Sequence, residues 1–312
     1  MEQFKTKLLS KNGIAIMSLA REMLMLDIGD RTKTVDQYTE TFGLGRGTIQ
    51  LALKFLQTEN AIKLESRGHL GTYIVAIDYK KLWILADIGT IIGVMPLPYT
   101  KRYEGLATGL YKSFENADIP FSLAFMRGAS KRIEALNQGR YNFVILSKLA
   151  ASLEIRKSTE IEIAYEFPEY SYVGEHVVVF RDKRQNKIQS GMKVGIDPDS
   201  IDQFLLTCYE CEGLEVEYVE TSYNQILQRL KNKEIDAAIW SSDELKNHTT
   251  KYSIAPLINA KAQETGKDDT TAVIVINKNN SFFKGILNKF INIEQVGILQ
   301  EKVMKEEILP TY

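Results

Sequence analysis

Segments 89–148 and 192–241 of this chain repeat one order of predicted structure: strand, helix, strand, helix, strand. Short apolar runs bounded by turn residues predict the strands, and apolar residues three and four positions apart predict the helices between them. In both segments the third strand ends in serine, as "YNFVILSK" in the first and "IDAAIWSS" in the second. Strands that alternate with helices are typical of α/β proteins built on parallel sheets. The repetition favours two similar lobes over one sheet whose halves resemble each other by chance.

The larger part of the chain, residues 78–312, is therefore predicted to form a bilobal α/β domain. We expect lobe 1 to contain about 88–178 and 272–312, and lobe 2 to contain about 179–271. The tail from residue 281 is rich in helix-forming sequence, and it either packs on the lobes or pairs two subunits. Gly105 and Gly109 stand one turn apart on a predicted helix, which indicates close packing against another helix.

The N-terminal part, residues 1–77, has a different pattern of three helices and a hairpin. The first helix is predicted from Asn12 to Ile28, ending at Gly29. "TVDQ", residues 34–37, fits a capping box that starts a second helix, which ends at residues 42–43. The third helix begins near residue 45 and carries a buried stripe with helical spacing, formed by Ile49, Ala52, Leu53 and Leu56. Two helices joined by a short turn and followed by a hairpin outline a winged helix-turn-helix.

The segment "RGHLGTY", residues 67–73, lies between the two predicted strands of the hairpin. Its glycines, arginine and histidine are compatible with a phosphate-binding loop, a metal or catalytic site, or a simple turn. No residue at suitable spacing offers His69 a partner for metal binding or nucleophilic catalysis. We interpret the segment as the tip of the wing, where glycines turn the chain and Tyr73 packs toward the helices.

Composition excludes few functions by itself. The 312 residues carry a net charge of −1 and are 44% hydrophobic, which is ordinary for globular proteins. No apolar run reaches the roughly 18 residues that would span a bilayer. The basic and apolar N-terminus fits an amphipathic helix better than a secretory signal, so we expect a cytoplasmic protein. Cys208 and Cys211 are interpreted as two small helix residues rather than a redox pair, and no metal site is predicted.

Residues 29–74 resemble the winged helix of GntR-type bacterial repressors. The match runs in register from "GDR" at 29–31, through Gly43 of the turn and Arg46 of the third helix, to "GT" at 71–72. The chain departs from that pattern at Gly45, where serine is usual, and at Gly47, where threonine or another side chain is usual. The departures remove two hydroxyl groups that could contact phosphate, and the wing is about two residues longer than usual.

The remainder of the chain resembles the type II periplasmic-binding-protein fold that many bacterial regulators use as an effector domain. Residues 93–151 are more similar still to the C-terminal domain of YhfZ-type transcriptional regulators, through the long motif "MPLPYTKRYEGLATGLY" at 95–111. This second resemblance extends over essentially the whole chain. It implies a winged helix joined to a bilobal effector domain, and it does not identify the effector.

The third helix of a winged helix enters the major groove with its N-terminal end nearest the bases. Arg46 is the best candidate for bidentate recognition of guanine, and Gln50 could reach base edges one turn later. Lys54 and the Thr34 end of the second helix would contact phosphates, while the wing would lie along the minor groove or adjacent phosphates. The residues predicted to contact DNA are Thr34, Arg46, Gly47, Thr48, Gln50, Lys54, Arg67, Gly68, His69 and Thr72.

Ligands of open α/β sheets bind beyond the carboxyl ends of the strands, near helix N-termini. Arg127 and Lys148 follow two of these strands, and together with helix N–H groups they would suit an anionic molecule. An ordinary strand-end cap is the alternative for each such residue. The candidate ligand-binding residues are Pro96, Leu97, Pro98, Tyr99, Arg127, Gly128, Ser147, Lys148, Asp197, Ser200, Thr221, Ser222, Trp240, Ser241 and Ser242.

The sequence thus predicts a DNA-binding transcriptional regulator that a small molecule controls. We expect a homodimer because winged helices usually bind pseudo-palindromic operators in double-stranded DNA. No catalytic motif is present, so neither enzymatic activity nor a cofactor is expected. Two alternatives remain: a solute-binding or enzymatic α/β protein with structural N-terminal helices, and a DNA-binding protein whose α/β part serves only oligomerisation.

Overall fold

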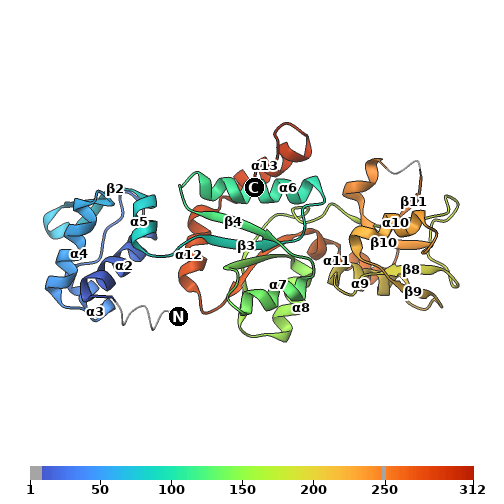
Figure 1. The fold of residues 1–312 in the computed structure, drawn as a ribbon, viewed down its shortest axis with the longest axis horizontal. Helices are drawn as coiled ribbons and strands as arrows, with labels where there is room; N and C mark the ends of the chain where they lie inside the picture. Colours follow the sequence, from blue (N-terminus) through green and yellow to red (C-terminus); the bar gives the residue numbers. More distant parts are fainter. Residues whose placement is uncertain (1–8, 248–250) are drawn as a thin grey trace. The chain divides into compact units, whose positions relative to one another are not determined.

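The computed structural model describes residues 9–247 and 251–312 (Figure 1). Contacts divide the chain into two compact units. The first unit comprises the chain as far as Ile91 together with Phe114–Phe121, and the second comprises Ile92–Ser113 and Ser122–Tyr312.

The first unit contains a winged helix-turn-helix, as the sequence predicted. Its elements are α2 (Lys11–Leu24), α3 (Val35–Phe42), α4 (Arg46–Thr58), β1 (Ile62–Ser66), β2 (Thr72–Ile77) and α5 (Tyr79–Leu85). The predicted capping box is present at the start of α3, where the Gln37 N–H donates to Thr34 Oγ1 at 3.3 Å and the Thr34 N–H donates to Gln37 Oε1 at 2.8 Å. Gly43 ends α3 in the left-handed conformation, with φ of 64°.

The predicted end of the first helix is wrong, because α2 ends at Leu24 rather than at Ile28. The chain leaves the helix in order to pair with the wing. The Gly29 N–H donates to the Ile74 carbonyl at 2.8 Å, and the Ile74 N–H donates to the Asp30 carbonyl at 2.9 Å. Gly29 has φ of +98° at this turn, a conformation that favours glycine. Gly29 therefore allows the chain to pair with β2, and it does not end the helix.

The core of this unit forms where the three helices meet the hairpin. Ile49, Ala52 and Leu56 of α4 are buried, whereas Leu53 of the predicted stripe is half-buried. The antiparallel strands β1 and β2 pair from Ile62 with Ile77 to Ser66 with Thr72. Helix α5, which the sequence analysis did not predict, buries Leu82 and Trp83 and packs against α2. The Trp83 indole N–H donates to the Gly89 carbonyl at 2.7 Å.

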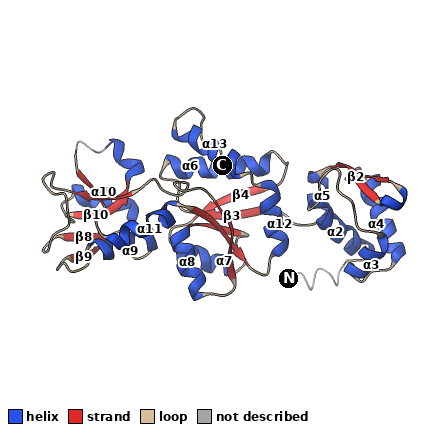
Figure 2. Ribbon diagram, turned by 180° about the vertical axis from the view of Figure 1, so that it is seen from behind, coloured by secondary structure: helices blue, strands red, loops and turns tan. Residues whose placement is uncertain are grey.

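Lobe 1 of the second unit is a five-stranded sheet in the order β4-β3-β5-β12-β6. Its strands are β3 (Ile91–Met95), β4 (Phe121–Phe125), β5 (Phe143–Ser147), β6 (Ile161–Glu166) and β12 (Ala272–Asn277). Helices α7 (Ala129–Asn137) and α8 (Lys148–Lys157) cover one face, and α6 (Lys101–Glu115), α12 (Ser281–Phe290) and α13 (Ile293–Met304) lie on the other (Figures 1 and 2).

Lobe 2 is a second five-stranded sheet, in the order β11-β7-β10-β8-β9. Its strands are β7 (His176–Phe180), β8 (Lys193–Ile196), β9 (Glu217–Glu220), β10 (Ala237–Ser241) and β11 (Ser253–Pro256). One face packs against α9 (Ile201–Glu210) and α11 (Ala260–Thr270) through Leu206 and Ala262, and the other packs against α10 (Ile226–Lys231). Cys208 on α9 and Cys211 directly after it are free thiols, and burial raises the pKa of Cys211 to about 11.

Both sheets are mixed, whereas the alternation of strands and helices predicted parallel sheets. The pairs β3–β5, β8–β10 and β8–β9 are parallel, as expected. Strand β12 is antiparallel to β5 and β6, and β7 is antiparallel to β10 and β11. These antiparallel strands adjoin the two segments, 167–175 and 257–271, that connect one sheet with the other.

The tail packs on lobe 1, which answers one of the questions that the sequence left open. A β-carbon on Gly105 would lie 2.8 Å from the Gln300 backbone, and one on Gly109 would lie 2.9 Å from Val296 Cα. The two glycines therefore allow α6 and α13 to approach closely, as their spacing predicted.

Candidate functional site

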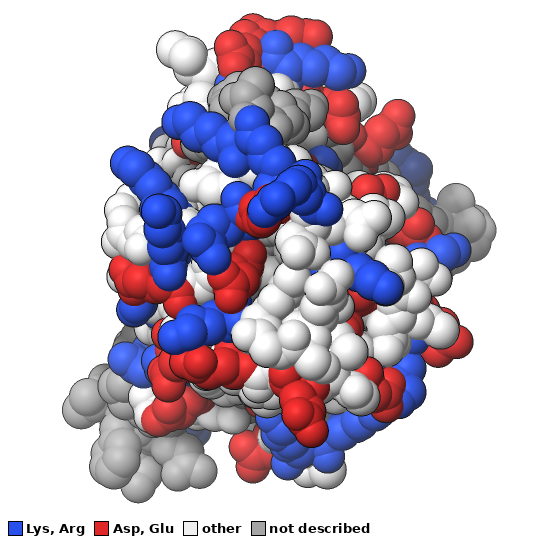
Figure 3. Space-filling model, turned by 90° about the vertical axis from the view of Figure 1, so that its right-hand side faces the viewer, with Lys and Arg blue, Asp and Glu red and all other residues white. Residues whose placement is uncertain are grey.

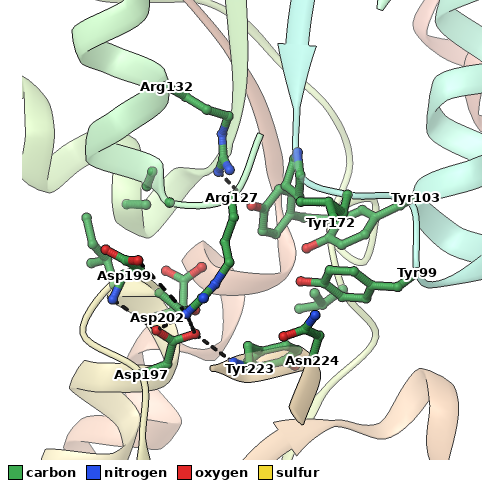
Figure 4. Close-up of a pocket in the computed structure, with 18 of the residues that line it drawn as sticks. Tyr99, Tyr103, Arg127, Arg132, Tyr172, Asp197, Asp199, Asp202, Tyr223 and Asn224 are labelled. Carbon is green, nitrogen blue, oxygen red and sulfur yellow. Dashed lines mark hydrogen bonds and ion pairs between the residues drawn. The ribbon is translucent and has the colours of Figure 1, made fainter. Parts of the chain in front are cut away.

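A cavity lies between the two lobes, at the ends of the strands (Figure 4). Lobe 1 contributes the segment after β3, the start of α7 and part of α6, and lobe 2 contributes the segments after β8 and β9. The lining residues are Pro96, Leu97, Tyr99, Tyr103, Arg127, Gly128, Ala129, Arg132, Ala150, Tyr172, Val173, His176, Asp197, Asp199, Ser200, Ile201, Asp202, Tyr223 and Asn224.

Seven of the candidate ligand-binding residues lie in this wall, because the strand-end rule places them at the cleft. They are Pro96, Leu97, Tyr99, Arg127, Gly128, Asp197 and Ser200. Two more lie just behind it and contact lining residues: Ser147 donates to Asp202 Oδ1 at 2.8 Å, and Ser222 accepts from Arg127 Nη1 at 2.6 Å.

The other six candidates lie outside the cavity lining. They are Pro98, Lys148, Thr221, Trp240, Ser241 and Ser242. Lys148 begins α8 and pairs with Glu166 at 2.7 Å and with Asp268 at 3.7 Å. Trp240 packs in the core beneath α10. The Thr221 hydroxyl donates to the Val219 carbonyl at 3.0 Å.

Arg127 and Asp197 form the main ion pair across the cleft. Arg127 Nη2 donates to both carboxylate oxygens of Asp197, at 2.7 and 2.8 Å. The same carboxylate accepts the backbone N–H groups of Asp199, at 3.0 Å, and of Tyr223, at 2.7 Å. Asp197 is 1% exposed. Asp197 therefore accepts four hydrogen bonds from three donor groups and is fully engaged while this pair is made, whereas the Arg127 side chain remains 39% exposed.

Further polar contacts join the lobes beside this pair. Lys131 of α7 contacts Asp199 at 2.8 Å. Arg102 of α6 donates from Nε and Nη2 to the two oxygens of Asp243, each at 2.9 Å, and both side chains are largely buried. Several ion pairs therefore hold the two lobes together.

A buried polar cluster forms the inner end of the cavity. His176 Nδ1 lies 2.8 Å from Asp269 Oδ2, and this contact joins the first residue of β7 to α11. Burial alone would lower the pKa of His176, but the charge and hydrogen bond of Asp269 outweigh it and raise the pKa. Burial, with a contribution from the charge of Asp269, raises the pKa of Asp202 to about 7.

Tyrosine rings form one wall of the cavity. Tyr99 and Tyr103 lie 5.7 Å apart between ring centroids, Tyr103 and Tyr172 lie 5.2 Å apart, and Tyr99 and Tyr223 lie 6.1 Å apart. The hydroxyl ends of Tyr99, Tyr103 and Tyr172 point into the cavity (Figure 4). The wall thus offers both apolar ring surface and hydroxyl groups to a bound molecule.

The sequence analysis missed Tyr103, Arg132, Tyr172, His176 and Asp202. Tyr103 stands four residues after Tyr99 on a predicted helix, so helical spacing could have indicated it. Tyr172 lies in the segment that connects the two sheets, and His176 is the first residue of the strand that follows it. Neither stands at the carboxyl end of a strand, so the strand-end rule does not predict them.

The residues predicted to contact DNA lie on the surface of the first unit. Arg46, Gly47 and Gln50 are exposed in the first turns of α4, and Lys54 is exposed farther along it, while Thr48 and Thr72 are half-buried. Arg46 forms an ion pair with Asp36 of α3. Thr34 is exposed, but its hydroxyl already accepts the capping hydrogen bond.

The wing tip has the predicted form of a tight turn. Residues 67–70 are exposed, including Arg67, Gly68 and His69, and Gly68 and Gly71 have φ of 57° and 101°. Arg67 contacts Glu65 at 2.7 Å, and its guanidinium lies 4.7 Å from the centre of the Tyr73 ring. A β-carbon on Gly71 would lie 2.4 Å from Arg31 Nε, so Arg31 is a basic residue beside the wing that the predictions omitted.

The face of lobe 2 in Figure 3 shows basic and acidic side chains interspersed. Within lobe 2, opposite charges form ion pairs, as in Arg181 with Asp236 and Arg184 with Asp182. Such mixing gives no extended field of one sign on that face.

Two further properties concern the described residues. No three side chains of the His, Cys, Asp and Glu types in residues 9–247 and 251–312 are arranged to hold a metal ion. No helix in the same ranges has the length and apolar character needed to cross a membrane.

Comparison with known proteins agrees with this architecture. Residues 27–74 match a family described as a helix-turn-helix domain, and residues 78–312 match the YhfZ C-terminal domain. The chain is 39% identical over 233 residues to YhfZ of Escherichia coli (strain K12), which is 75% of each chain. The crystal structure of YhfZ from Shigella flexneri superposes with a TM-score of 0.61 at 32% identity, and covers 75% of this chain and 97% of that one.

The fold extends to more distant proteins. The periplasmic VFT2 domain of Bordetella pertussis BvgS superposes with a TM-score of 0.50 at 12% identity, and covers 72% of this chain and 96% of that domain. The molecule is thus a helix-turn-helix protein with a bilobal, periplasmic-binding-protein-like α/β domain. Within that class, the chain belongs to the YhfZ family.

Proposed function

We propose that this chain is a DNA-binding transcriptional regulator whose operator binding is modulated by a small molecule bound between the lobes. The observation that carries the proposal is that one chain joins a helix-turn-helix domain with an exposed recognition helix to a domain with an interlobe cavity. A DNA-binding role places the protein in the cytoplasm. Residues 1–77 would serve DNA binding and residues 78–312 effector binding.

On the DNA side, the proposal assigns base recognition to Arg46 and Gln50. Both are exposed at the N-terminal end of α4, which is the part of a recognition helix that meets the bases. Arg46 would exchange its contact with Asp36 for a guanine. The wing residues Arg67 and His69 would approach the minor groove or neighbouring phosphates.

On the ligand side, modulation requires two states with unequal affinity for the molecule. The proposed states differ in how the lobes are held, because several ion pairs join them. The chain would act as a homodimer on a pseudo-palindromic operator.

The catalytic alternative gains no support from the cavity. The Ser147 hydroxyl donates to Asp202, and His176 pairs with Asp269, so these groups do not form a nucleophile and base of the kind that activates serine. The proposal therefore includes no reaction.

A gel shift on DNA upstream of the protein's own coding sequence, titrated with salt, tests the DNA-binding part. We expect selective binding that weakens steeply with salt, because phosphate contacts release counterions. Arg46→Ala should lose about 1–3 kcal/mol and most of the selectivity. The matched control is Arg184→Ala, an exposed arginine of lobe 2 that should bind as the unaltered protein does. Equal binding of upstream and unrelated DNA would refute this function.

A further inference from the structure

Arg132 is a buried cation in the wall of the cavity. It is 3% exposed, and it extends from α7 toward the tyrosine wall (Figure 4). Its Nη1 donates to the Met126 carbonyl at 2.7 Å, and its Nη2 lies 3.5 Å from the Tyr172 hydroxyl. Its buried Nε has no hydrogen-bond partner. Unlike Arg127, it forms no ion pair with a carboxylate of the described residues.

A buried guanidinium without an ion pair lowers the free energy of unfolding unless a bound group supplies a negative charge. A guanidinium cannot lose its proton at accessible pH, so it cannot become neutral to escape burial. An unpaired buried ion costs several kcal/mol after relaxation. Folding alone would favour a methionine or leucine at this position.

The carboxylates that line the cavity do not supply that charge. Asp197 is engaged by Arg127, and Asp199 is engaged by Lys131. Asp202 accepts the Ser147 hydroxyl, and burial keeps much of its population protonated near neutral pH. Arg132 therefore forms no ion pair with these carboxylates, and the nearby Asp202 compensates its charge only in part.

The backbone around Arg132 is also suited to an anion. Gly128 and Ser200, which directly precede α7 and α9, both lie in the cavity wall, and no side chain caps either helix. The first N–H groups of a helix have no intrahelical acceptor, and the helix dipole favours negative charge there.

Resting on the function proposed above, we infer that the ligand is a small organic anion whose carboxylate or phosphate group pairs with Arg132 while its body packs on the tyrosine wall. Tyr103 and Tyr172 are buried in the same wall, and the Tyr103 hydroxyl donates to the Tyr172 hydroxyl, which leaves the Tyr172 hydroxyl to donate to the anionic group. Arg127, which sequence position suggested as the anion site, instead holds the lobes together through Asp197.

The first test needs no ligand. We compare the Tm of the full chain with those of Arg132→Met and Arg127→Met, two equal substitutions five residues apart. Arg132→Met should raise Tm by about 2–4 °C, because it removes a buried charge that is compensated only in part and keeps the side-chain volume. Arg127→Met should lower Tm, because it leaves Asp197 buried without its cation. A fall in Tm for Arg132→Met to the level of Arg127→Met would make Arg132 structural and overturn the inference.

The second test measures the response to defined probes by calorimetry at constant ionic strength. Benzoate presents a carboxylate on an aromatic ring, phenyl phosphate presents a phosphate on the same ring, and benzamide and benzylamine are the neutral and cationic controls. At least one anion should bind, with neither control binding, and Arg132→Met should weaken that binding about tenfold or more. Arg132→Lys, which keeps the charge, should retain part of it.

The two anions distinguish a carboxylate ligand from a phosphate ligand. Identical responses of the unaltered chain and Arg132→Met to both anions, including no response in either, would overturn the inference. Neither test uses DNA, so a failure of the regulator function would leave both readouts interpretable. Conversely, Arg132→Met should still give the selective gel shift, since Arg132 lies outside the helix-turn-helix domain.

Discussion

Asp202 shows how burial controls a titrating side chain at the inner end of the cleft. Its carboxyl group is buried on α9, close enough to Asp269, His176 and Arg132 to sense their charges. Burial and the negative charge of Asp269 raise its pKa from 3.8 to about 7, against the opposing effects of Ser147, His176 and Arg132. The folded protein therefore keeps a proton on Asp202 that the unfolded chain releases near pH 4.

This proton makes stability depend on pH. Because the folded state binds more protons than the unfolded state between about pH 4 and pH 7, the free energy of unfolding should fall as pH rises through that range. Asp202→Asn cannot ionise, so it should remove a fall on the order of 3 kcal/mol. Denaturant melts of both proteins at pH 4, 5.5, 7 and 8 measure it. Parallel pH profiles for the two proteins would contradict the assignment.

Asp36 competes for the arginine that is proposed to read DNA. The Asp36 and Arg46 side chains are both largely exposed, so their ion pair adds little stability. Asp36→Asn should therefore leave Tm nearly unchanged and tighten operator binding about three- to tenfold at low salt, with a smaller gain at high salt. Fluorescence anisotropy with labelled upstream DNA measures the change, and Asp182→Asn in lobe 2 is the control. Weaker binding by Asp36→Asn would mean that Asp36 positions Arg46 for recognition.

At the scale of the element, α6 and α13 show what a pair of glycines contributes. Gly109 lies against the Val296 backbone with no room for a β-carbon, whereas Gly297 of α13 has open space around its own. Gly109→Ala should lower the free energy of unfolding by about 1–3 kcal/mol through overpacking. Gly297→Ala should raise it by up to about 1 kcal/mol, because alanine favours the helix. Equal effects of the two substitutions in denaturant melts would show that the helices can separate without cost.

The elements were largely predictable because local signals specify them. The capping box at Thr34 and Gln37 and the turn at Gly43 are short-range features, and the structure contains both. The end of α2 was not predictable, since Gly29 is placed by its pairing with Ile74, which lies 45 residues away. The antiparallel direction of β7 and β12 likewise depends on where the chain passes between sheets, which no local pattern specifies.

Residues of the candidate site were predictable from the sequence only where they follow the end of a strand. Arg127 and Asp197 follow strands and line the cavity, as the strand-end rule expects. Arg132 and Asp202 come from within helices, so their position depends on the rotation of each helix against its sheet. Lys148 follows a strand too, but it pairs with Glu166 outside the lining, because the rule specifies location and not side-chain direction.

At the scale of the whole α/β domain, the Arg102–Asp243 pair holds the lobes together. Burial opposes the ionisation of Asp243, but Arg102 and the Gly174 N–H lower its pKa below the usual value. Arg102→Met should leave this carboxylate buried without a cation, destabilise the domain by about 3 kcal/mol and open the lobes. Small-angle scattering should show a larger radius of gyration, and adding Asp243→Asn should restore part of the stability. An unchanged scattering profile would assign closure to the other pairs.

Strand β7, where the chain enters lobe 2, pairs with β11, where it leaves, and Val177 lies opposite Pro256 in their register. Lobe 2 is thus one continuous stretch of chain whose two ends are neighbours. A module with adjacent ends can be exchanged for a related one without rearranging its host. In the history of such proteins, this geometry would let half of a ligand-binding surface be replaced by recombination in a single event, while lobe 1 and the helix-turn-helix domain kept their sequence.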